Sequence, residues 1–361
     1  MKRIKSFIFI LMASVTLYTG CNDEIDIYAE YEDIPIVYGL LNVADSVHTF
    51  KINRIFQGTA AVEDMAKDRS LSEYENLSGQ LIEYRVDGNA DTVPIGVPMN
   101  LEEIEIDNKD SGIFYYPEQK LYQVEAVLDE NHIYELVINS EEGKITRART
   151  SIVPQNDVLL ADERRYTIGG FNTFSQSTDI LIDVRPPNNA KIINALMEFR
   201  YRNEFQDGTV SDVIIIPFSL GDYIVSKVGR EGNEAEEITM RFTSRFFYQT
   251  IAENTLPIVE EPNVKQRIPL DETIRLVFTS GDQEFYTYVE VSAPPEGILE
   301  DKPIYTNVEN GVGIFTSRST EERAYGMTNQ SFTELVEGDF YGLTRDRGFC
   351  YLTGNDDRSC F

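Results

Sequence analysis

The sequence predicts an all-β protein made of two β-sandwich-like regions, with short helices and a glycine-rich C-terminal segment. Apolar and polar residues alternate with a period of two in many short stretches, as in Leu121–Leu128 and Leu196–Asn203. This alternation is typical of strands that have one face on a core. Turn dipeptides such as Asp87-Gly88 and Asp207-Gly208 follow several of the stretches. Short strands with polar turns favour sandwiches of immunoglobulin or fibronectin type.

The first region, residues 33–154, begins with a strand at Ile34–Leu41. Pro35 suits a strand start, because a proline donates no backbone hydrogen bond. A second strand follows at His48–Phe56, and Gln57–Ser78 then breaks the alternation, which predicts a loop with some helix. Further strands are expected at Leu81–Val86, Leu121–Leu128, Ile133–Asn139 and Lys144–Ile152.

The second region, residues 155–300, is separated from the first by the proline-bearing run Val153–Asp157. A short helix is expected through Asn254, with Ser244 as its N-cap. Thr273–Thr279 and Glu284–Val291 read as the two strands of a long hairpin. The other expected strands are Asp179–Val184, Leu196–Asn203, Val213–Ile216 and Ile238–Phe242.

The last segment, residues 301–361, is glycine-rich and contains one helix signal. Ser331 and Glu334 have the spacing of a capping box, in which each side chain satisfies a backbone N–H at a helix start. A helix is therefore expected just after Ser331.

The N-terminus predicts a lipid anchor. Three positive charges precede an apolar run, Phe7–Leu17, which is shorter than the ~20 residues needed to span a bilayer. Thr19-Gly20 supplies small residues directly before Cys21. This pattern resembles a bacterial lipoprotein signal, which implies cleavage of residues 1–20 and lipidation of the Cys21 thiol. A plain secretory signal and an N-terminal membrane helix are the alternatives.

Residues 21–32 read as an acidic tether. The run Asn22–Asp26 resembles the surface-export signal of Bacteroidetes lipoproteins, and a solvated linker is the alternative interpretation. The expected location is the outer membrane, held through the lipid, with the cell surface favoured over the periplasmic face.

Composition limits the partners. The chain of 361 residues has 61 Asp and Glu against 32 Lys and Arg, a formal net charge of −29. Such a charge repels phosphate backbones, so no nucleic-acid partner is expected. The hydrophobic fraction of 42% is sufficient for sizeable cores.

With Cys21 assigned to the anchor, two cysteines remain. An exported protein meets an oxidising compartment, so Cys350 and Cys360 are candidates for a disulfide that closes a small terminal loop. A two-cysteine metal site is the weaker alternative, because no histidine lies nearby in the sequence.

Catalytic and cofactor motifs are missing from the sequence. It contains no HExxH, Cys/His metal spacing, P-loop, GxGxxG or GxSxG. The two histidines, His48 and His132, are expected at the surface or in turns. Asp107–Gly112 resembles a calcium loop but has Lys109 at its third position. No cofactor and no metal are therefore predicted, while a looser calcium site and a carboxylate-pair hydrolase remain open alternatives.

Four stretches resemble one family. They are Ile34–Gly39, Tyr134–Ile138, Ala148–Pro154 and Tyr305–Phe315. In this order they resemble uncharacterised Bacteroidetes lipoproteins that are known only as a domain of unknown function. The resemblance covers most of residues 34–316. It implies a β-rich protein that often accompanies a TonB-dependent outer-membrane receptor, and it supplies no catalytic residues.

The most specific of these stretches contains a candidate binding or closing loop. Gly311 and Gly313 permit positive φ or a close backbone approach. One interpretation is a binding loop with Asn307, Asn310 and Phe315; the favoured one is a closing segment that packs the C-terminus onto the second region.

The sequence thus favours a lipid-anchored, non-catalytic protein that assists a TonB-dependent uptake receptor. The alternative is a surface module that binds glycan or peptide or acts in adhesion. Two aromatic clusters, Phe114-Tyr115-Tyr116 and Phe246-Phe247-Tyr248, could stack on sugars, although such clusters more often belong to cores or interfaces.

Overall fold

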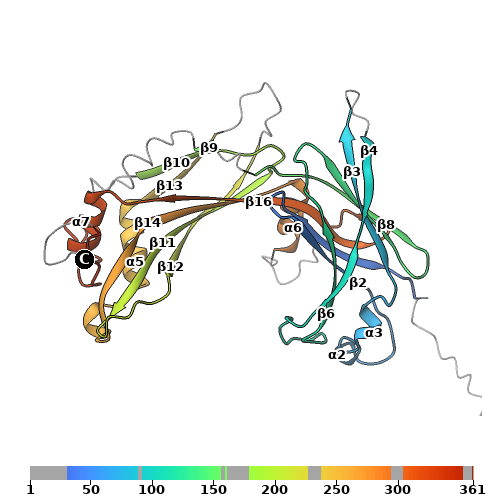
Figure 1. The fold of residues 1–361 in the computed structure, drawn as a ribbon, viewed down its shortest axis with the longest axis horizontal. Helices are drawn as coiled ribbons and strands as arrows, with labels where there is room; N and C mark the ends of the chain where they lie inside the picture. The colour runs from blue at the N-terminus through green and yellow to red at the C-terminus, as the bar shows by residue number, and fades with distance from the viewer. Residues whose placement is uncertain are drawn as a thin grey trace, which may run out of the picture. The chain divides into compact units, whose positions relative to one another are not determined.

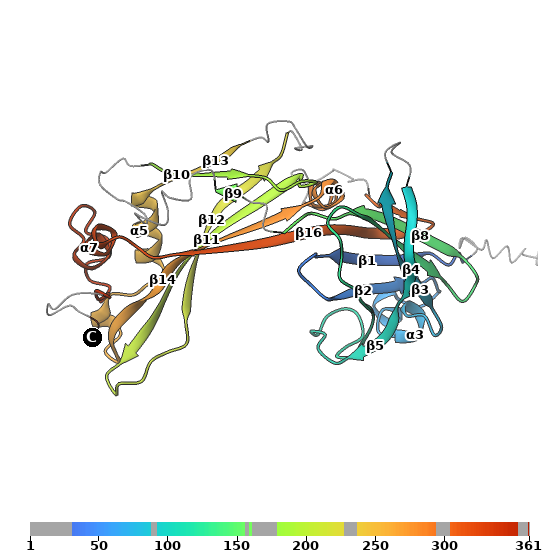
Figure 2. The same ribbon diagram turned by 45° about the horizontal axis from the view of Figure 1, so that its top comes forward.

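An eight-stranded sheet runs through most of the protein (Figures 1 and 2). All its neighbouring strands are antiparallel except β16 and β1, which are parallel. In order across the sheet, the strands are β12 (Ile214–Ile224), β11 (Ile192–Phe205), β14 (Val264–Gly281), β16 (Val312–Tyr325), β1 (Pro35–Leu41), β2 (Val47–Arg54), β6 (Gln119–Glu125) and β5 (Glu102–Ile106).

This computed structural model describes residues 31–87, 92–155, 159–160, 179–226, 237–293, 304–352 and 360. Residues Ile34–Phe361 form one unit. The predicted signal peptide, Cys21 and nearly all of the acidic tether lie outside the described residues. Within the described ranges, no helix is long and apolar enough to cross a membrane.

Two smaller sheets complete the β structure, so the prediction of an all-β fold is confirmed. One has five strands in the order β15 (Val308–Glu309), β8 (Ile145–Ser151), β7 (Ile133–Asn139), β3 (Ser78–Val86) and β4 (Thr92–Asn100). The other has three, in the order β13 (Ile238–Thr243), β10 (Asp179–Arg185) and β9 (Leu159–Leu160).

Each smaller sheet shares a core with one part of the large sheet. The first core combines residues of β1, β2 and β6 with residues of β3, β7 and β8, and includes Phe50, Leu136 and Phe315. The second combines β10 and β13 with β11, β12 and β14, and includes Phe199 and Phe247. The apolar positions of the alternating stretches therefore face these two cores, as the period of two predicts.

The two regions share β16. Its first residues pair with β1, as in Val312 with Ile36, and its last residues pair with β14, as in Tyr325 with Ile274. The two cores lie on either side of the predicted boundary near Pro154, but the eight-stranded sheet contains strands of both regions. The predicted closing segment, residues 301–361, supplies β16, which is common to both regions.

Short helices pack against the sheets, with α6 (Gln283–Ser292) beside β16 (Figure 1). The expected helix at Ser244 is present, but Thr243 is its N-cap, since its hydroxyl accepts from the Phe246 N–H. The helix near Ser331 is capped by Thr328, so the predicted capping box is wrong. The helices of the described residues are α2 (Val62–Met65), α3 (Arg69–Ser72), α5 (Ser244–Glu253), η2 (Ile258–Glu260), α6 (Gln283–Ser292) and α7 (Asn329–Glu337).

The predicted hairpin between Thr273 and Val291 is also wrong. Its first strand is part of β14, but Glu284–Val291 lies in α6. The buried carboxylate of Asp282 explains the helix, because it accepts from the Phe285 N–H at 2.8 Å as an N-cap. The same carboxylate accepts from Thr150 of β8 at 2.7 Å and from Thr316 of β16. This cap outweighs the strand propensity of the sequence.

Candidate functional site

A groove of about 550 Å³ lies over the outer face of β1 and β2. Its walls come from two covering segments, residues 55–72, which include α2 and α3, and the loop at residues 109–115. The aliphatic side chains that line it are Ile36, Ile55, Val62 and Met65, and its aromatic ones are Tyr38, Phe56, Phe114 and Tyr115.

Strand alternation builds the floor of the groove. Val37 and Phe50 are fully buried in the core, so their neighbours along each strand face outward. Tyr38 of β1 pairs with Lys51 of β2, and Ile36 pairs with Asn53. These four outward residues all line the groove.

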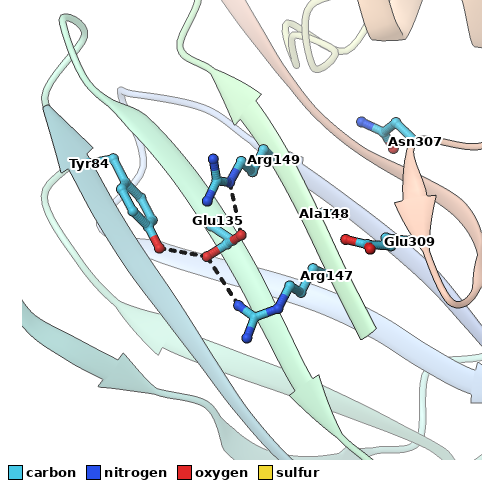
Figure 3. A pocket seen from close by; sticks show the side chains of 7 residues that line it. All are labelled: Tyr84, Glu135, Arg147, Ala148, Arg149, Asn307 and Glu309. Atoms are coloured by element: carbon cyan, nitrogen blue, oxygen red, sulfur yellow. Dashed lines mark hydrogen bonds and ion pairs between the residues drawn. The ribbon is translucent and has the colours of Figure 1, made fainter. Parts of the chain in front are cut away.

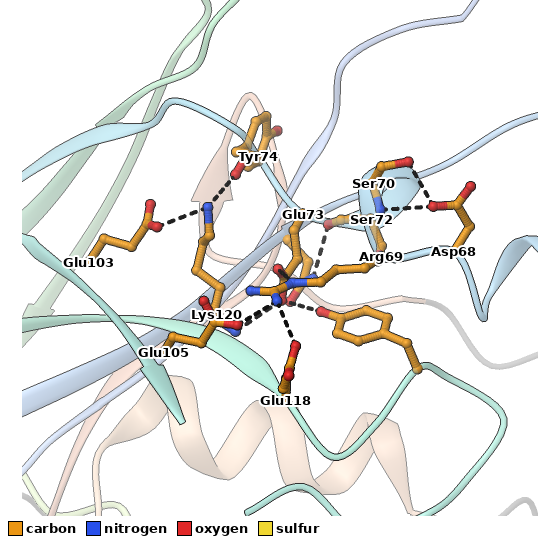
Figure 4. Close-up of polar contacts among 12 residues, drawn as sticks. Asp68, Arg69, Ser70, Ser72, Glu73, Tyr74, Glu103, Glu105, Glu118 and Lys120 are labelled. Atoms are coloured by element: carbon orange, nitrogen blue, oxygen red, sulfur yellow. Dashed lines mark hydrogen bonds and ion pairs between the residues drawn. The ribbon is translucent and has the colours of Figure 1, made fainter. Parts of the chain in front are cut away.

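The carboxylate of Glu73 holds the walls to the floor (Figure 4). It accepts hydrogen bonds from Arg69 Nε, from the Tyr115 hydroxyl, and from the Lys120 N–H at 2.9 Å. Lys51 Nζ lies 3.7 Å from the same carboxylate. The Glu73 side chain is only 4% exposed. A single buried carboxylate therefore joins α3, the 109–115 loop, β6 and β2.

The network extends from Glu73 to the edge of the sheet (Figure 4). Arg69 Nη1 also lies 2.6 Å from Glu105 of β5 and 3.2 Å from Glu118. Lys120 Nζ donates to the Tyr74 carbonyl at 2.8 Å and lies 3.0 Å from Glu103. The covering segments are thus tied to two strands at once, which keeps the groove preformed.

Electrostatics favour the ionised form of Glu73. Burial would raise the pKa of its carboxyl, but the hydrogen bonds from Tyr115, Arg69 and the Lys120 N–H, and the charge of Arg69, hold that pKa below its ordinary value. The pKa of the Tyr115 hydroxyl is raised, chiefly by burial and next by its hydrogen bond to Glu73. Tyr115 is therefore fixed as a neutral hydrogen-bond donor.

Three cations line the groove, Lys51, Arg54 and Lys109, and none of its lining residues is acidic. Lys109 lies over the Tyr115 ring at 4.2 Å and near the Phe114 ring at 5.6 Å. Arg54 donates to the Ser70 carbonyl at 2.9 Å, and its guanidinium lies over the Tyr74 ring. Among the residues that the structure describes, neither Lys109 nor Arg54 has a carboxylate within ion-pair distance.

Desolvation acts on both lysines of the groove. Burial lowers the pKa of Lys51, and the carboxylate of Glu73 offsets this only in part. Burial also lowers the pKa of Lys109, and the charge of Glu73 offsets this only in part. A lowered lysine pKa means that the charged form lacks compensation in its surroundings.

A second hollow of about 470 Å³ lies on the five-stranded sheet (Figure 3). At its centre the buried Glu135 accepts from Tyr84 at 2.7 Å, from Arg149 at 2.8 Å and from Arg147 at 3.4 Å. Glu309 also lines it, so two carboxylates balance two guanidinium groups. This arrangement reads as a cross-strand cluster that stabilises the sheet.

The residues of the predicted binding or closing loop have structural contacts. Asn307 exchanges two hydrogen bonds with the backbone of Phe315, at 2.6 and 2.9 Å, and Phe315 is fully buried against Phe50. Asn310 has a φ of 58° and donates to the Ile145 carbonyl. The segment therefore packs onto the first region, where the sequence favoured the second.

Both glycines of this loop lie against backbone. A Cβ on Gly313, whose φ is 111°, would stand 2.0 Å from the Val37 carbonyl oxygen. A Cβ on Gly311 would stand 2.9 Å from the Pro35 carbonyl oxygen. Of the five residues proposed for this loop, Asn307 lines the hollow in Figure 3.

The other predicted residues divide between core and groove. Cys350 and Cys360 form a disulfide with a Cα–Cα distance of 5.2 Å, as expected, while Cys21 lies outside the described residues. In the second aromatic cluster Phe247 and Tyr248 are fully buried. In the first, Phe114 and Tyr115 line the groove.

Of the two histidines only His48 differs from the expectation, because His132 lies at the bend directly before β7. His48 is 2% exposed, and its Nε2 donates to the Ala126 carbonyl at 3.1 Å; burial lowers its pKa. His132 Nδ1 lies 2.7 Å from Glu83, which also accepts from Tyr134 at 2.8 Å. No group of three or more metal-ligating side chains is present in the described part of the chain.

Comparisons with known proteins add little. No family model matches the chain, and no curated protein matches it significantly. One solved structure, the C-terminal globular domain of the oligosaccharyltransferase from Pyrococcus abyssi, aligns at 11% identity with a TM-score of 0.19. The alignment covers 84% of this chain and 51% of that one, so the chain spans about half its length. A TM-score this low supports no inference about fold or function.

Proposed function

We propose that this protein is a lipid-anchored, non-catalytic binding protein of the outer membrane, and that the groove over β1 and β2 is its ligand site. The groove carries the proposal, because its volume of about 550 Å³ falls in the ~300–1,000 Å³ range of small-molecule sites. Phe114 and Tyr38, each close to half exposed, present apolar surface at its rim. A preformed apolar hollow with a few polar groups is the usual form of a ligand pocket.

The lining favours binding over chemistry. A carboxylate-pair hydrolase needs two acids beside its substrate, and no acid lines the groove. The buried Glu73 is occupied by Arg69, Tyr115 and Lys120, so it is not free to transfer protons.

A fluorescent apolar anion, 1-anilinonaphthalene-8-sulfonate (ANS), tests the ligand site. Val62→Trp fills the groove from α2 at a position that is 63% exposed, whereas the matched control Val97→Trp adds the same indole to β4, at 84% exposure, outside the groove. We expect saturable binding to the native protein and to Val97→Trp, weakened about 5-fold or more (about 1 kcal/mol) in Val62→Trp. Equal affinity in all three proteins would contradict the proposal.

The anchor and the partner rest on the sequence. Cys21 at the end of a short apolar signal supports membrane attachment, and the family resemblance supports a TonB-dependent receptor as the partner. Tagged protein is extracted from native membranes in mild detergent, with Cys21→Ala as control. Co-purification of a receptor with the native protein, and loss of membrane fractionation in Cys21→Ala, are expected. Recovery of the native protein without a receptor would contradict the partnership, and membrane retention of Cys21→Ala would contradict the anchor.

A further inference from the structure

From the charges that line the groove we infer the class of its ligand: an organic anion with an apolar, largely flat body, such as an aromatic or aliphatic carboxylate or sulfonate. This inference rests on the proposed function, and it goes further by naming what the site selects.

The charges that line the groove are unbalanced. Acidic residues outnumber basic ones by 61 to 32 in the chain, yet three cations and no acid line the groove. A cation with a structural role could readily pair with one of these many carboxylates. Lys109 and Arg54 instead have no described carboxylate within ion-pair distance. Uncompensated like charges around a hollow destabilise the free protein and attract an anion.

Hydrogen-bond donors of the groove remain available to a ligand. The Nε of Arg54 is buried and has no hydrogen-bond partner among the described residues, and only one of the guanidinium N–H groups has a described acceptor, the Ser70 carbonyl. The contacts of the Lys109 ammonium group are with aromatic rings, so all three of its N–H donors are free of described acceptors. A buried or half-buried donor without an acceptor is costly, and an anionic ligand would supply that acceptor.

The apolar lining of the groove favours a ligand with an apolar body. Most of the lining is apolar, and its uncharged polar side chains are few, chiefly Asn53 and Ser72. The Asn53 amide already donates to the Ser72 carbonyl at 2.9 Å. A neutral glycan needs many hydrogen-bond partners for its hydroxyl groups, so this lining favours an apolar body instead. The rings of Phe114 and Tyr115 provide flat surface for it.

The test compares two probes that share one body. ANS carries a sulfonate, and N-phenyl-1-naphthylamine (NPN) is nearly the same molecule without it. Each is titrated by fluorescence against the native protein and the variants Lys109→Met and Arg54→Met, which remove the charge but keep an apolar stem. Arg202→Met is the matched control, because Arg202 is an exposed cation of β11 that does not line the groove.

We expect each groove variant to weaken ANS about 5-fold and NPN less than about 2-fold, as for the loss of one partly exposed ion pair. Arg202→Met should change neither probe. Added salt should weaken ANS binding to the native protein and have a smaller effect on Lys109→Met and on Arg54→Met. Because the Lys109 ammonium group donates to no described acceptor, Lys109→Met is expected to fold even if Arg54→Met does not.

The other outcomes separate the two proposals. Equal weakening of both probes would mean that the cations only shape the groove, and this would overturn the inference. Unchanged binding of both probes in both groove variants would overturn it as well. If Val62→Trp changes the binding of neither probe, the groove is not the ligand site and the proposed function itself fails.

Discussion

Replacing Glu73 with Gln should destabilise the protein and open the groove. The substitution keeps the size of the side chain but removes the charge that Arg69, Tyr115 and the Lys120 N–H contact. Breaking a buried pair by removing one partner costs about 3–5 kcal/mol. Arg69 is 31% exposed and keeps Glu105 and Glu118 as partners, so the loss is smaller here. We expect the free energy of unfolding to fall by about 2–3 kcal/mol.

The effect should depend on pH in a defined direction. The folded-state pKa of Glu73 lies below its ordinary value, so its stabilising contribution is complete above the unfolded pKa of about 4.3. It is lost as the pH falls through the lower folded pKa. The difference between the native protein and Glu73→Gln should therefore be constant from about pH 7 to 5 and shrink below about pH 4.

Urea unfolding followed by far-ultraviolet circular dichroism measures this difference, since the chain has no tryptophan to report it. Glu118→Gln is the matched control: it removes another carboxylate near Arg69, but one that is 62% exposed, so a loss under about 0.5 kcal/mol is expected. If Glu73→Gln costs no more than Glu118→Gln, Glu73 does not hold the walls of the groove. ANS affinity should also fall in Glu73→Gln, although Glu73 is not among the residues that line the groove.

Three further predictions concern other parts of the protein. Gly313→Ala should lower the free energy of unfolding by more than about 4 kcal/mol, because the new Cβ would overlap the Val37 carbonyl. Gly143→Ala, at a position with positive φ but open space, should lower it by about 1–2 kcal/mol. Thermal unfolding compares the two variants, and similar midpoints would contradict the register of β16 and β1. Replacing both Cys350 and Cys360 with Ala should lower the free energy of unfolding by about 2.5–3 kcal/mol, because the disulfide no longer closes the loop. Urea unfolding measures this loss, and an unchanged midpoint would contradict the disulfide. Burial lowers the pKa values of Lys51 and Lys109 below 10.5, so ANS affinity should already decline as the pH approaches 10.5. A decline that begins only above pH 10.5 would contradict desolvated lysines in the groove.

The strands could be predicted because alternation survives wherever one face is buried. Lys144–Ile152 shows this, with Arg147 and Arg149 outward as expected, whereas Ile133–Asn139 is buried on both faces although its sequence alternates. β4 was missed, because its prolines and Gly96 resemble a loop in an edge strand that is mostly exposed. α6 was missed for the opposite reason: its aromatic and β-branched residues favour a strand, and the cap of Asp282 depends on contacts from β8 and β16.

The groove could not be predicted from sequence. Lys51, Arg54 and Lys109 are brought together by the pairing of β1 with β2 and by a loop that Glu73 holds in place. Glu73 itself lies among many charged residues, and no spacing distinguishes it from them. The usable signal was the run Phe114-Tyr115-Tyr116, because such aromatics in a polar loop are costly unless they pack or bind. The lipoprotein signal is the opposite case, since it is local in sequence and needs no tertiary contact.

The most direct measurement is a crystal structure of the protein bound to ANS. We expect the probe to occupy the groove, with its rings against Phe114 and Tyr115 and its sulfonate within ion-pair distance of Lys109 or Arg54. A probe bound instead at the Arg147 and Arg149 face of the five-stranded sheet, or bound in the groove with its sulfonate turned away from all three cations, would contradict it.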